Sequence, residues 1–504
     1  MKVLIANRGE IAVRIMRACR ELGLPSVAVY SDSDRLAPHV RYADQAIGLD
    51  ADAPDDTYLD IEKLLDAAHR AGAEMVHPGY GFLAENAEFA TACLEAGLKF
   101  VGPPPEVIAL MGGKTSARLA AKKAGVPVVP GTESPLDASS TEHAALETAK
   151  NIGYPLFVKA VAGGGGKGMR LVKEPSELIG AVETARSEAQ GAFGDSAVYL
   201  ERSVNPARHI EVQIMADNHG RVVPFVEREC SVQRRHQKVI EETPSPAVSE
   251  ETRQGLAAAA RALAEGVGYV NAGTVEFLLD DEEKFYFLEM NTRLQVEHPI
   301  TEMVTGMDLV HCQLRVTAGE ALNLDSEKAI KPQGHAIECR VYAEDPEVGF
   351  IPCPGRITRL VQPSGPGIRD DSGVDEGFTV PVFYDSMISK LVAWAPDRTK
   401  AIERMRRALG EYQIEGVKTT LPFFRWMLQQ PTFLEGNVHT AFLDQLLADR
   451  QRGSFSVVTS EAEEQVVVAA AVHTFLTTKN RSYESLPLQD SSIWRRIARR
   501  ESLR

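Results

Sequence analysis

Two glutamates, Glu276 and Glu289, are spaced so that they could share a cation. They lie in the stretch T-V-E-F-L-L-D-D-E-E-K-F-Y-F-L-E-M-N-T-R, symmetrically about a turn centred between Glu282 and Glu283. We expect a β-hairpin in which the two carboxylates face each other, and opposed like charges destabilise a sheet unless positive charge lies between them. Asn291 follows two residues after Glu289 and so shares its face. These oxygen donors suit Mg²⁺ that holds nucleotide phosphates, although two carboxylates solvated on an outer sheet face would have the same spacing.

A glycine-rich segment upstream could bind the phosphates themselves. The peptide Y-P-L-F-V-K-A-V-A-G-G-G-G-K-G-M contains an apolar run at 156–160 that predicts a strand. The glycines that follow are Gly163, Gly164, Gly165 and Gly166. Their N–H groups can cradle phosphate oxygens, and the loop could close over a nucleotide. A flexible linker is the alternative, but the flanking Lys159 and Lys167 favour phosphate binding, and the pattern is not that of a Walker loop.

Two further segments offer polar side chains at strand spacing. A-R-H-I-E-V-Q-I alternates His209, Glu211 and Gln213 with apolar residues, which predicts a strand with one face that packs and another that can bind a ligand. The run R-R-H-Q-K, which ends at Lys238, could be a solvated basic patch. It could also bring a cation to metal-bound phosphate, as phosphoryl transfer requires.

Composition sets limits on the class of protein. The 504 residues suggest roughly three domains, and the net charge of −15 argues against a nucleic-acid partner. Six cysteines without C-x-x-C spacing argue against a zinc site or a disulfide framework and favour the reducing cytoplasm. The first predicted strand begins at Lys2, which leaves no room for a signal or transit peptide, although a processed organellar chain would look the same. The apolar run 466–472 is too short to span a membrane, so no membrane partner is expected.

The N-terminal third alternates between strand and helix patterns, which predicts a parallel sheet with helices on both faces. The predicted elements are strands at 3–6, 27–30, 74–76 and 99–101, a helix that runs to Leu22 with Gly23 as its C-cap, and a helix that ends at Gly97. No G-x-G-x-x-G follows the first strand, so dinucleotide binding is poorly supported. The segment 102–106, G-P-P-P-E, predicts a domain boundary.

The glycine loop, the acidic hairpin and the peptide E-M-N-T-R-L-Q-V-E-H-P-I-T-E together resemble the ATP-grasp enzymes, and specifically the biotin carboxylases. The resemblance extends over I-A-N-R-G-E-I-A, H-P-G-Y-G-F-L-A-E-N, R-R-H-Q-K and E-C-R-V-Y-A-E-D-P, to about residue 446. It implies an α/β ATP-grasp fold with an N-terminal parallel-sheet, Rossmann-like domain, a mobile glycine-loop lid and a larger mixed or antiparallel C-terminal domain. The implied boundaries are 1–112, 113–330 with a lid at about 132–203, and 331–446, followed by an extension of uncertain role at 447–504.

The resemblance also implies which residues meet each substrate. Those expected at ATP are Lys114, Lys159, Gly163, Gly164, Gly165, Gly166, Met169, Glu201, Arg202, Val204, His209, Gln233, His236 and Leu278. Glu276, Glu289 and Asn291 would bind Mg²⁺ or Mn²⁺, Gln295 and the N–H of Val296 would bind bicarbonate, and Tyr80 would lie near biotin. Glu201 is expected to meet adenine. Arg202 stands where the family often has lysine, and its planar guanidinium could change the contact with the base.

Four residues are expected to carry the catalysis. Arg293 can fork two donors onto bicarbonate, and Glu297 can accept the bicarbonate proton. Lys238 would face the phosphates, and Arg340 would stabilise negative charge on the ureido oxygen of biotin. A surface salt bridge for Arg340 and a helix-start residue for Glu297 are the alternatives.

The reaction implied by the resemblance has two steps. Bicarbonate attacks the γ-phosphate of MgATP to give carboxyphosphate and ADP, and carboxyphosphate then breaks down to carbon dioxide and phosphate. The phosphate takes the N1 proton of biotin, and the enolate captures carbon dioxide. The closed lid would exclude water from both labile intermediates.

The chain contains no Met-Lys-Met, so biotin would arrive on a separate biotin carboxyl carrier protein or as the free molecule. A separate carboxyltransferase and a homodimer, formed through 204–446, are also expected. Acetyl-CoA carboxylase of fatty acid biosynthesis is the favoured complex, with propionyl-CoA or pyruvate carboxylase as others. A different ATP-grasp ligase and a catalytically silent regulatory subunit remain as alternatives. A helix is expected at 461–476, and the arginine-rich end at 485–504 is either an ordinary basic tail or a docking segment.

Overall fold

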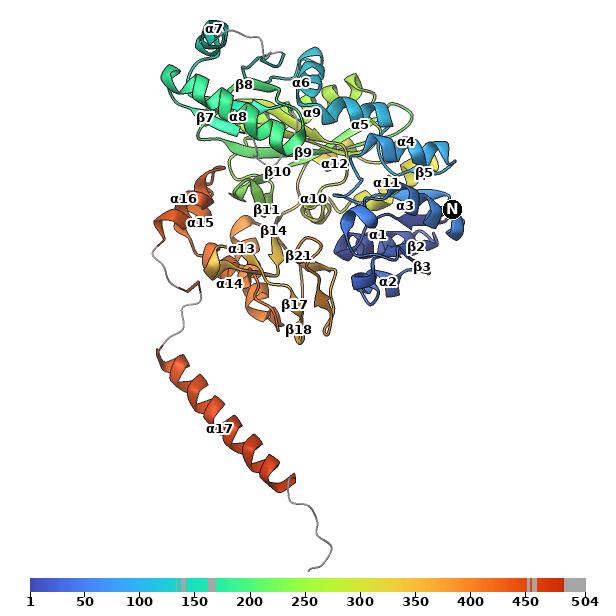
Figure 1. The fold of residues 1–504 in the computed structure, drawn as a ribbon, viewed down its shortest axis with the longest axis vertical. Coiled ribbons are helices and arrows are strands. Elements are labelled where there is room, and N and C mark those ends of the chain that lie inside the picture. Colours follow the sequence, from blue (N-terminus) through green and yellow to red (C-terminus); the bar gives the residue numbers. More distant parts are fainter. Residues whose placement is uncertain (133, 137–141, 162–168, 451–453, 456–459, 485–504) are drawn as a thin grey trace, which may run out of the picture. The chain divides into compact units, whose positions relative to one another are not determined.

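The computed structural model describes residues 1–132, 134–136, 142–161, 169–450, 454–455 and 460–484. The chain divides into two compact units, Met1–Gly453 and Ser454–Arg504, and the first contains the two large sheets (Figure 1). Within the described residues, no helix combines the length and the apolar character that crossing a membrane requires.

The N-terminal sheet is parallel, with strand order β3-β2-β1-β4-β5. Its strands are β1 (Val3–Ile5), β2 (Ser26–Tyr30), β3 (Gln45–Gly48), β4 (Met75–His77) and β5 (Lys99–Phe100). The predicted strands are therefore confirmed to within one residue at each end. β3 was not predicted, because Q-A-I-G carries only a weak strand signal.

Helices cover both faces of this sheet, as predicted. Val3 and Ile5 of β1 pack in one apolar core with α1 (Gly9–Glu21). Leu4, between them, packs in another core with α3 (Ile61–Ala71) and α4 (Ala87–Glu95). The alternation follows from the two-residue period of a strand, which sends successive side chains to opposite faces.

The predicted ends of two helices that pack against this sheet need correction. α1 ends at Glu21 with Leu22 as its C-cap, and α4 ends at Glu95. Gly23 and Gly97 follow these ends with φ of +68° and +76°. A glycine in the left-handed region belongs just outside the helix, so the last helical residue precedes it.

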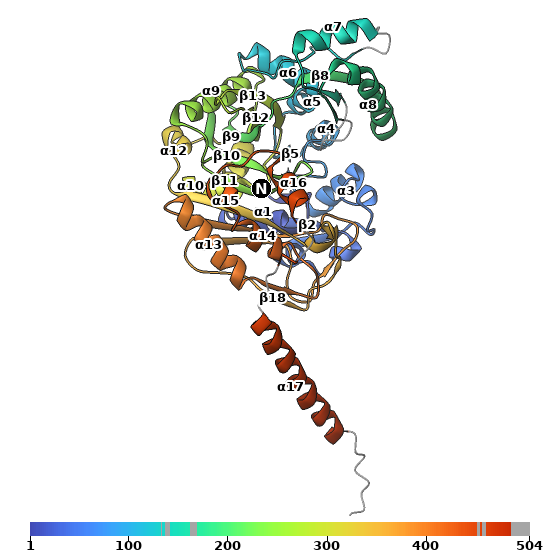
Figure 2. The same cartoon turned by 90° about the vertical axis from the view of Figure 1, so that its left-hand side faces the viewer.

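The second large sheet is antiparallel, with strand order β13-β12-β9-β10-β11-β14-β21-β19. Its strands are β9 (Arg208–Ala216), β10 (Val222–Arg234), β11 (Gln237–Thr243), β12 (Asn271–Leu279), β13 (Phe285–Asn291), β14 (His335–Tyr342), β19 (Ile368–Ser372) and β21 (Met387–Ala395). Helix α9 (Glu250–Gly266) packs against β9 and β10 (Figure 2).

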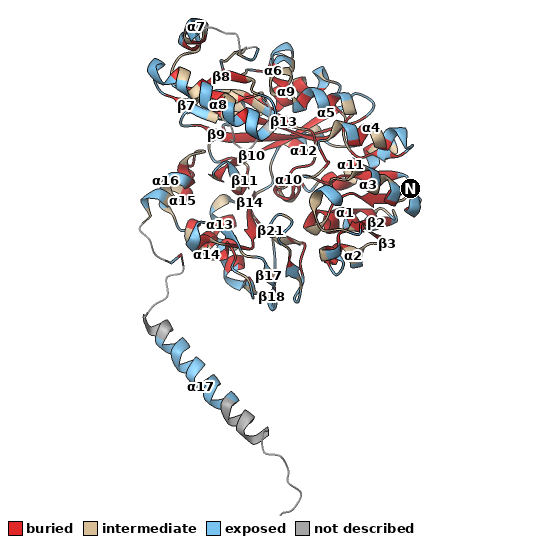
Figure 3. Ribbon diagram, in the orientation of Figure 1, coloured by how far each residue is buried: buried red, intermediate tan, exposed pale blue. Residues whose placement is uncertain are grey.

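Apolar side chains fill the side of this sheet that faces α9. Ile210, Val212 and Ile214 of β9 share one core with Leu256 and Leu263 of α9. The alternate side chains of β9, which include the predicted His209, Glu211 and Gln213, must therefore point to the other face. Figure 3 shows that the central strands are buried along most of their length, so this polar face is enclosed as well.

A smaller antiparallel sheet, β7-β6-β8, has a core of its own with two helices. Its elements are β6 (Leu156–Ala160), β7 (Met169–Val172), β8 (Val198–Arg202), α7 (Glu142–Ile152) and α8 (Leu178–Phe193). The predicted strand at 156–160 is confirmed. Gly163, Gly164, Gly165 and Gly166 connect β6 to β7 but lie outside the described residues.

Two helices follow β13: α10 (His298–Thr305) and α11 (Leu309–Ala318). The second unit contains α17 (Ser460–Glu484), which confirms the helix predicted at 461–476 and extends it. Several of its apolar side chains are exposed, among them Val466, Val467 and Phe475 at 66% each. The arginine-rich end at 485–504 lies outside the described residues.

Candidate active site

A row of charged side chains crosses four strands of the antiparallel sheet. Glu276 of β12 is paired in register with Glu289 of β13 on one side and with Glu211 of β9 on the other. Glu211 is in turn paired with Arg228 of β10. The predicted hairpin and the opposition of its two glutamates are thus confirmed. Glu276 is buried whereas Glu289 is exposed, so the two carboxylates do not share one solvated face.

Nitrogen donors surround the Glu276 carboxylate. Its Oε1 accepts hydrogen bonds from Lys238 Nζ at 2.9 Å, from Asn291 Nδ2 at 2.8 Å and from Gln295 Nε2 at 3.0 Å. Nε2 of His209 lies 2.9 Å from Oε2. Burial alone would raise the pKa of Glu276, but Lys238 and then His209 outweigh it and hold the pKa below its usual range.

Glu289 has the opposite electrostatic environment. Although Glu289 is exposed as a residue, the protein around its carboxylate removes part of the hydrating water and so raises its pKa, and the negative charge of Glu276 raises the pKa further. A divalent cation between the two carboxylates would remove this repulsion. Glu276, Glu289 and Asn291 offer carboxylate and amide oxygens from one face of the hairpin, and these are the donors that Mg²⁺ prefers. The residues present therefore fit Mg²⁺ or Mn²⁺.

Lys238 lies where three buried carboxylates meet. Its Nζ is 2.5 Å from Glu211 Oε2, 2.7 Å from Glu297 Oε1 and 2.9 Å from Glu276 Oε1. Burial would lower the pKa of the ammonium, but these carboxylates outweigh it and raise the pKa well above its ordinary value. Lys238 therefore stays charged throughout the working pH range.

The other members of R-R-H-Q-K point elsewhere. Arg235 and His236 are exposed at the turn between β10 and β11, where both have positive φ. Arg234 approaches Glu344 at 3.5 Å. The basic run is thus divided between the surface and the interior, and among its members only Lys238 enters the row of glutamates.

Glu297 and Arg340 form a second buried pair beside Lys238. Glu297 is the N-cap residue of α10, but its side chain makes no capping hydrogen bond. Instead Oε2 accepts from Arg340 Nη2 at 2.9 Å, and Arg340 Nε donates to Glu241 Oε1 at 2.6 Å. Burial would raise the pKa of Glu297, yet Lys238 and Arg340 hold it well below its usual range. Arg340 is buried, so it is not in a surface salt bridge.

The loop after β13 presents Arg293 with each of its three guanidinium nitrogens in a hydrogen bond. Its Nη1 donates to Gln295 Oε1 at 2.8 Å, its Nη2 to Asn291 Oδ1 at 3.1 Å, and its Nε to Glu85 Oε2 at 2.8 Å. The carbonyl of Val296 accepts from Lys390 Nζ at 3.0 Å. The structure therefore brings Arg293 into contact with Gln295, and Val296 lines the same cavity as Arg293.

The described residues expected at ATP lie on the smaller sheet, on β9, β10 and β12, at the start of α6 (Lys114–Lys123) and in the turns beside these strands. Lys159 and Arg118 both pair with the Glu201 carboxylate, the latter at 2.7 Å, so two cations engage the side chain expected at adenine. Lys114 Nζ donates to the carbonyl of Ala160 at 3.3 Å, which places it at the C-terminal end of β6. Gln233 Nε2 and His209 Nδ1 are 2.7 Å apart.

Register places the remaining members of this set. Met169 is opposite Lys159, and Leu278 is opposite His209. Arg202 ends β8, and Val204 follows it. Exposed His236 does not contact His209 or Lys238 within hydrogen-bonding distance among the described residues.

A cavity of about 480 Å³ opens beside Arg293 and Arg340. Tyr80, predicted near this end of the site, lines it together with Phe82 and Tyr384. A lining that combines arginine and aromatic side chains suits a ring-shaped ligand that has a polar edge.

Several partners were missed by the sequence analysis: Glu85, Arg118, Arg228, Glu241 and Lys390. Arg228 is wholly buried and holds Glu211 through its Nε. Only Glu85 had a signal, because it lies within the peptide H-P-G-Y-G-F-L-A-E-N.

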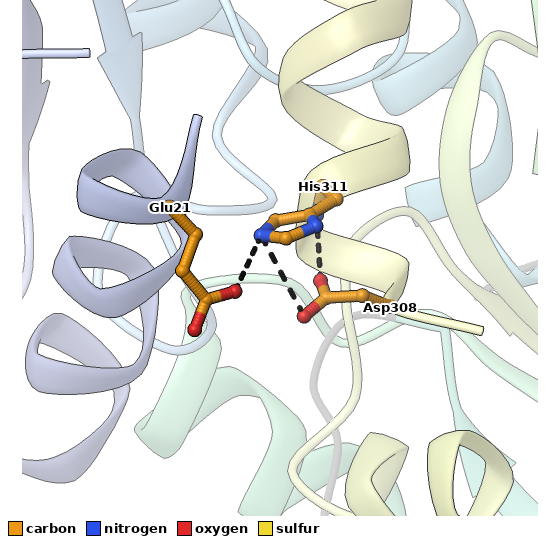
Figure 4. A group of neighbouring side chains, drawn as sticks. All are labelled: Glu21, Asp308 and His311. Carbon is orange, nitrogen blue, oxygen red and sulfur yellow. Dashed lines mark hydrogen bonds and ion pairs between the residues drawn. The ribbon is translucent and has the colours of Figure 1, made fainter. Parts of the chain in front are cut away.

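A separate group of Glu21, Asp308 and His311 lies where α1 meets α11 (Figure 4). His311 Nε2 is 3.0 Å from Glu21 Oε2 and 3.9 Å from Asp308 Oδ2. Asp308 also caps α11 by accepting the His311 N–H at 2.7 Å, and it pairs with Arg14 at 2.8 Å. These contacts show that the three side chains join the two helices, which explains why they lie together.

Three family models match successive parts of the chain. They are the biotin carboxylase N-terminal domain at 1–108, the ATP-binding domain of the carbamoyl-phosphate synthase L chain at 113–325, and the biotin carboxylase C-terminal domain at 338–445.

Curated relatives cover most of the chain at about half identity. A pyruvate carboxylase subunit of Methanothermobacter thermautotrophicus is 51% identical over 478 residues, which are 95% of this chain and 96% of that protein. The biotin carboxylase of Nostoc sp. is 50% identical over 445 residues, which are 88% of this chain and 99% of that protein.

Solved structures agree with these relatives. The biotin carboxylase–β-γ-ATP complex of Campylobacter jejuni is 45% identical, with a TM-score of 0.84 and coverage of 88% of this chain and 98% of that one. The biotin carboxylase domain dimer of Hydrogenobacter thermophilus 2-oxoglutarate carboxylase, in complex with MgADP, ADP and bicarbonate, is 44% identical. Its TM-score is 0.84, and the match covers 91% of this chain and 99% of that one.

Proposed function

Because the chain belongs to the biotin carboxylase family, we propose that the side chains gathered around Lys238 carry out the carboxylation of biotin. The protein is an ATP-dependent ligase, and its substrates are MgATP, bicarbonate and biotin. It is the biotin carboxylase component of a biotin-dependent carboxylase.

The position of Lys238 is the observation that carries the assignment of residues. One ammonium contacts Glu276, at the hairpin that suits a metal, and Glu297, at the loop that carries Arg293. The phosphate end and the bicarbonate end of the reaction thus meet at a single cation. This arrangement fits an enzyme in which a bicarbonate oxygen must attack a γ-phosphorus.

The loop residues would act on bicarbonate. The terminal nitrogens of Arg293 would exchange the oxygens of Gln295 and Asn291 for those of the anion, and the N–H of Val296 would add a further donor. Glu297 is ionised, so it can accept the bicarbonate proton as the new O–P bond forms and ADP leaves.

The second step would take place at the cavity beside Arg340. Carboxyphosphate gives carbon dioxide and phosphate, and the phosphate takes the N1 proton of biotin. Arg340, anchored by Glu241, would stabilise the negative charge that develops on the ureido oxygen. Tyr80 lines the same cavity and would lie against the biotin rings.

Glu276, Glu289 and Asn291 would hold Mg²⁺, which would offset the charge of the β- and γ-phosphates. Lys114 and Lys159 would meet the phosphates from the other side. Met169, Glu201, Arg202, Val204, His209, Gln233, His236 and Leu278 would line the nucleotide site. The glycine loop within a lid at about 132–203 would cover it. The domain boundaries of 1–112, 113–330 and 331–446, with the extension at 447–504, are part of this proposal.

The partners implied are a biotin carboxyl carrier protein and a carboxyltransferase. The M. thermautotrophicus relative is named as one subunit of its enzyme, and the H. thermophilus structure is described as a dimer, which supports a homodimer of this chain within a larger complex. The reducing cytoplasm fits its cysteines, which form no disulfide in the described residues. The exposed apolar side chains of α17 suit a contact with another protein of that complex.

The acceptor of the carboxyl group is proposed to be a 2-oxo acid. The alignment with the pyruvate carboxylase component of M. thermautotrophicus spans 478 residues, so it must extend past residue 446, whereas that with the Nostoc biotin carboxylase spans 445. This difference favours pyruvate or a related acid over the acetyl-CoA expected from the sequence. Reconstitution with the carrier and transferase of the same source would decide between them, because oxaloacetate and malonyl-CoA are separable products.

The first test is ADP release by the purified chain with MgATP and bicarbonate, with and without free biotin. Release that requires bicarbonate and is stimulated by biotin supports the proposal. Turnover indifferent to biotin would indicate another ATP-grasp ligase, and ATP binding without turnover would indicate a regulatory role.

A further inference from the structure

Arg293 and the backbone that carries it are held by a residue from a distant part of the chain. Glu85 lies between β4 and α4, whereas Arg293 follows β13. Oε1 of Glu85 accepts the Thr292 N–H at 2.9 Å, and its Oε2 accepts Arg293 Nε at 2.8 Å. One carboxylate therefore holds both the main chain of the loop and the plane of the guanidinium.

This contact determines which donors of Arg293 remain for a ligand. With Nε engaged, the two terminal nitrogens are left, and both contact side-chain oxygens of the loop. Burial would lower the pKa of the Arg293 guanidinium, but Glu85 outweighs it and raises the pKa. The contact with Glu85 thus favours the charged form of Arg293 without occupying its terminal nitrogens.

The segment that carries Glu85 is itself held firmly on both sides. Before it, Asn7 Nδ2 donates to the carbonyls of Pro78 and Tyr80 at 2.7 and 2.8 Å. A Cβ at Gly79, where φ is +66°, would come within 2.9 Å of the same Nδ2, so glycine is needed there. After it, Asn86 caps α4 by accepting the Phe89 N–H at 2.7 Å. A side chain on so fixed a segment can position its partner accurately.

We propose that Glu85 is a positioning residue of the bicarbonate site, acting through Arg293 and the Thr292 peptide. The inference rests on the proposed function, because it takes Arg293 as the receptor of the anion.

Two effects of Glu85 on bicarbonate oppose each other. Its negative charge weakens the attraction of the site for an anion, whereas its two hydrogen bonds place the donors that bind the anion. The Glu85 side chain is 40% exposed, so solvent screens its charge. Its two hydrogen bonds act at contact distance and are not weakened in this way. Positioning should therefore dominate, and removal of Glu85 should weaken bicarbonate binding.

The direction in which the KM for bicarbonate changes tests whether positioning dominates over repulsion. In the full chain with free biotin as acceptor, Glu85→Ala should raise the KM for bicarbonate about tenfold and Glu85→Gln about threefold, since glutamine keeps one acceptor. The KM for ATP should stay within about twofold of the wild-type value. Glu88→Ala is the matched control, because Glu88 is an exposed glutamate three residues away, and it should leave both constants unchanged.

Two results would overturn the inference: a fall in the KM for bicarbonate, which would mean that Glu85 only opposes the anion, and a parallel rise in the KM for ATP, which would mean general damage. Arg293→Ala separates the two levels of the argument. If it leaves the KM for bicarbonate unchanged, the anion site itself is misassigned and both proposals fail. If it raises that KM while Glu85→Ala does not, only the role of Glu85 fails.

The double variant tests whether Glu85 acts through Arg293. In the Arg293→Ala background, Glu85→Ala should raise the KM for bicarbonate by less than about twofold.

Discussion

Replacing Lys238 by methionine should destabilise the protein in a way that depends on pH. The change removes the ammonium but keeps most of the side-chain volume. Three buried carboxylates lose a contact, but each keeps another partner: Glu211 keeps Arg228, Glu276 keeps His209, and Glu297 keeps Arg340. Breaking a buried ion pair costs about 3–5 kcal/mol. Because those partners remain, we expect the lower end, about 3 kcal/mol at pH 8.

The sign of the pH dependence follows from the lowered pKa values of Glu276 and Glu297. A carboxylate whose pKa is lowered by folding contributes stability that is present above its unfolded pKa, about 4.3, and lost as pH falls through the folded value. Lys238 is a main source of this contribution. In Lys238→Met the carboxylates can instead take up protons on acidification, so the deficit relative to the wild type should be largest at pH 8 and shrink toward pH 5.

Thermal unfolding at pH 8 and at pH 5.5 provides the measurement. For a unit of this size, the deficit at pH 8 corresponds to a lowering of Tm of roughly 3 °C. Lys284→Met is the control, because Lys284 is an exposed lysine at the hairpin turn and pairs only with Glu282 among the described residues. An equal deficit at both pH values, or none at pH 8, would refute the idea that Lys238 neutralises this cluster.

Three further outcomes are expected. Glu297→Gln should lower bicarbonate-dependent ADP release by about 10²–10⁴-fold while nucleotide binding by titration calorimetry is retained, and turnover within threefold of wild type would contradict a base at this position. Glu289→Gln should raise the Mg²⁺ concentration for half-maximal ADP release by about tenfold, and an unchanged Mg²⁺ response would remove Glu289 from the metal site. Burial raises the pKa of Glu10 to about 7, so the wild type loses stability as pH rises from about 4.5 through 7. The Tm of Glu10→Gln relative to wild type should therefore be higher at pH 8 than at pH 5, and a constant difference would show that Glu10 does not titrate there.

The sequence predicted those parts of the site that local periodicity controls. The pairing of Glu276 with Glu289 followed from their symmetry about a turn, and the polar face of β9 followed from alternation within one strand. Both depend on the two-residue period of a strand, which spacing reveals.

Contacts between distant segments could not be predicted in this way. Arg118 reaches Glu201 across 83 positions, and Glu85 reaches Arg293 across 208. Such pairs depend on how separate layers pack, and no spacing in the chain records that packing. The resemblance to biotin carboxylases named the residues that we propose for the reaction centre, but the residues that hold them became visible only in the structure.

The contacts of Lys238 also imply an order to the chemistry. Glu297 is ionised, but Lys238 and Arg340 keep its pKa low, so it is a weak base in the absence of substrates. A γ-phosphate bound near Glu276 would compete for the Lys238 ammonium. Transfer of that ammonium to phosphate would remove the cation that lowers the pKa of Glu297 most, ahead of Arg340 and Arg228, and the basicity of Glu297 would rise.

Bicarbonate would then lose its proton readily only when ATP is in place, which limits proton transfer to the complex that can react. We therefore expect the acid limb of the pH profile of kcat/KM for bicarbonate to lie at higher pH with saturating ATP than with limiting ATP. The ionisation of bicarbonate itself is common to both profiles and cancels in the comparison. Coincident acid limbs would show that the basicity of Glu297 does not depend on the nucleotide, and that Lys238 stays with the carboxylates throughout the reaction.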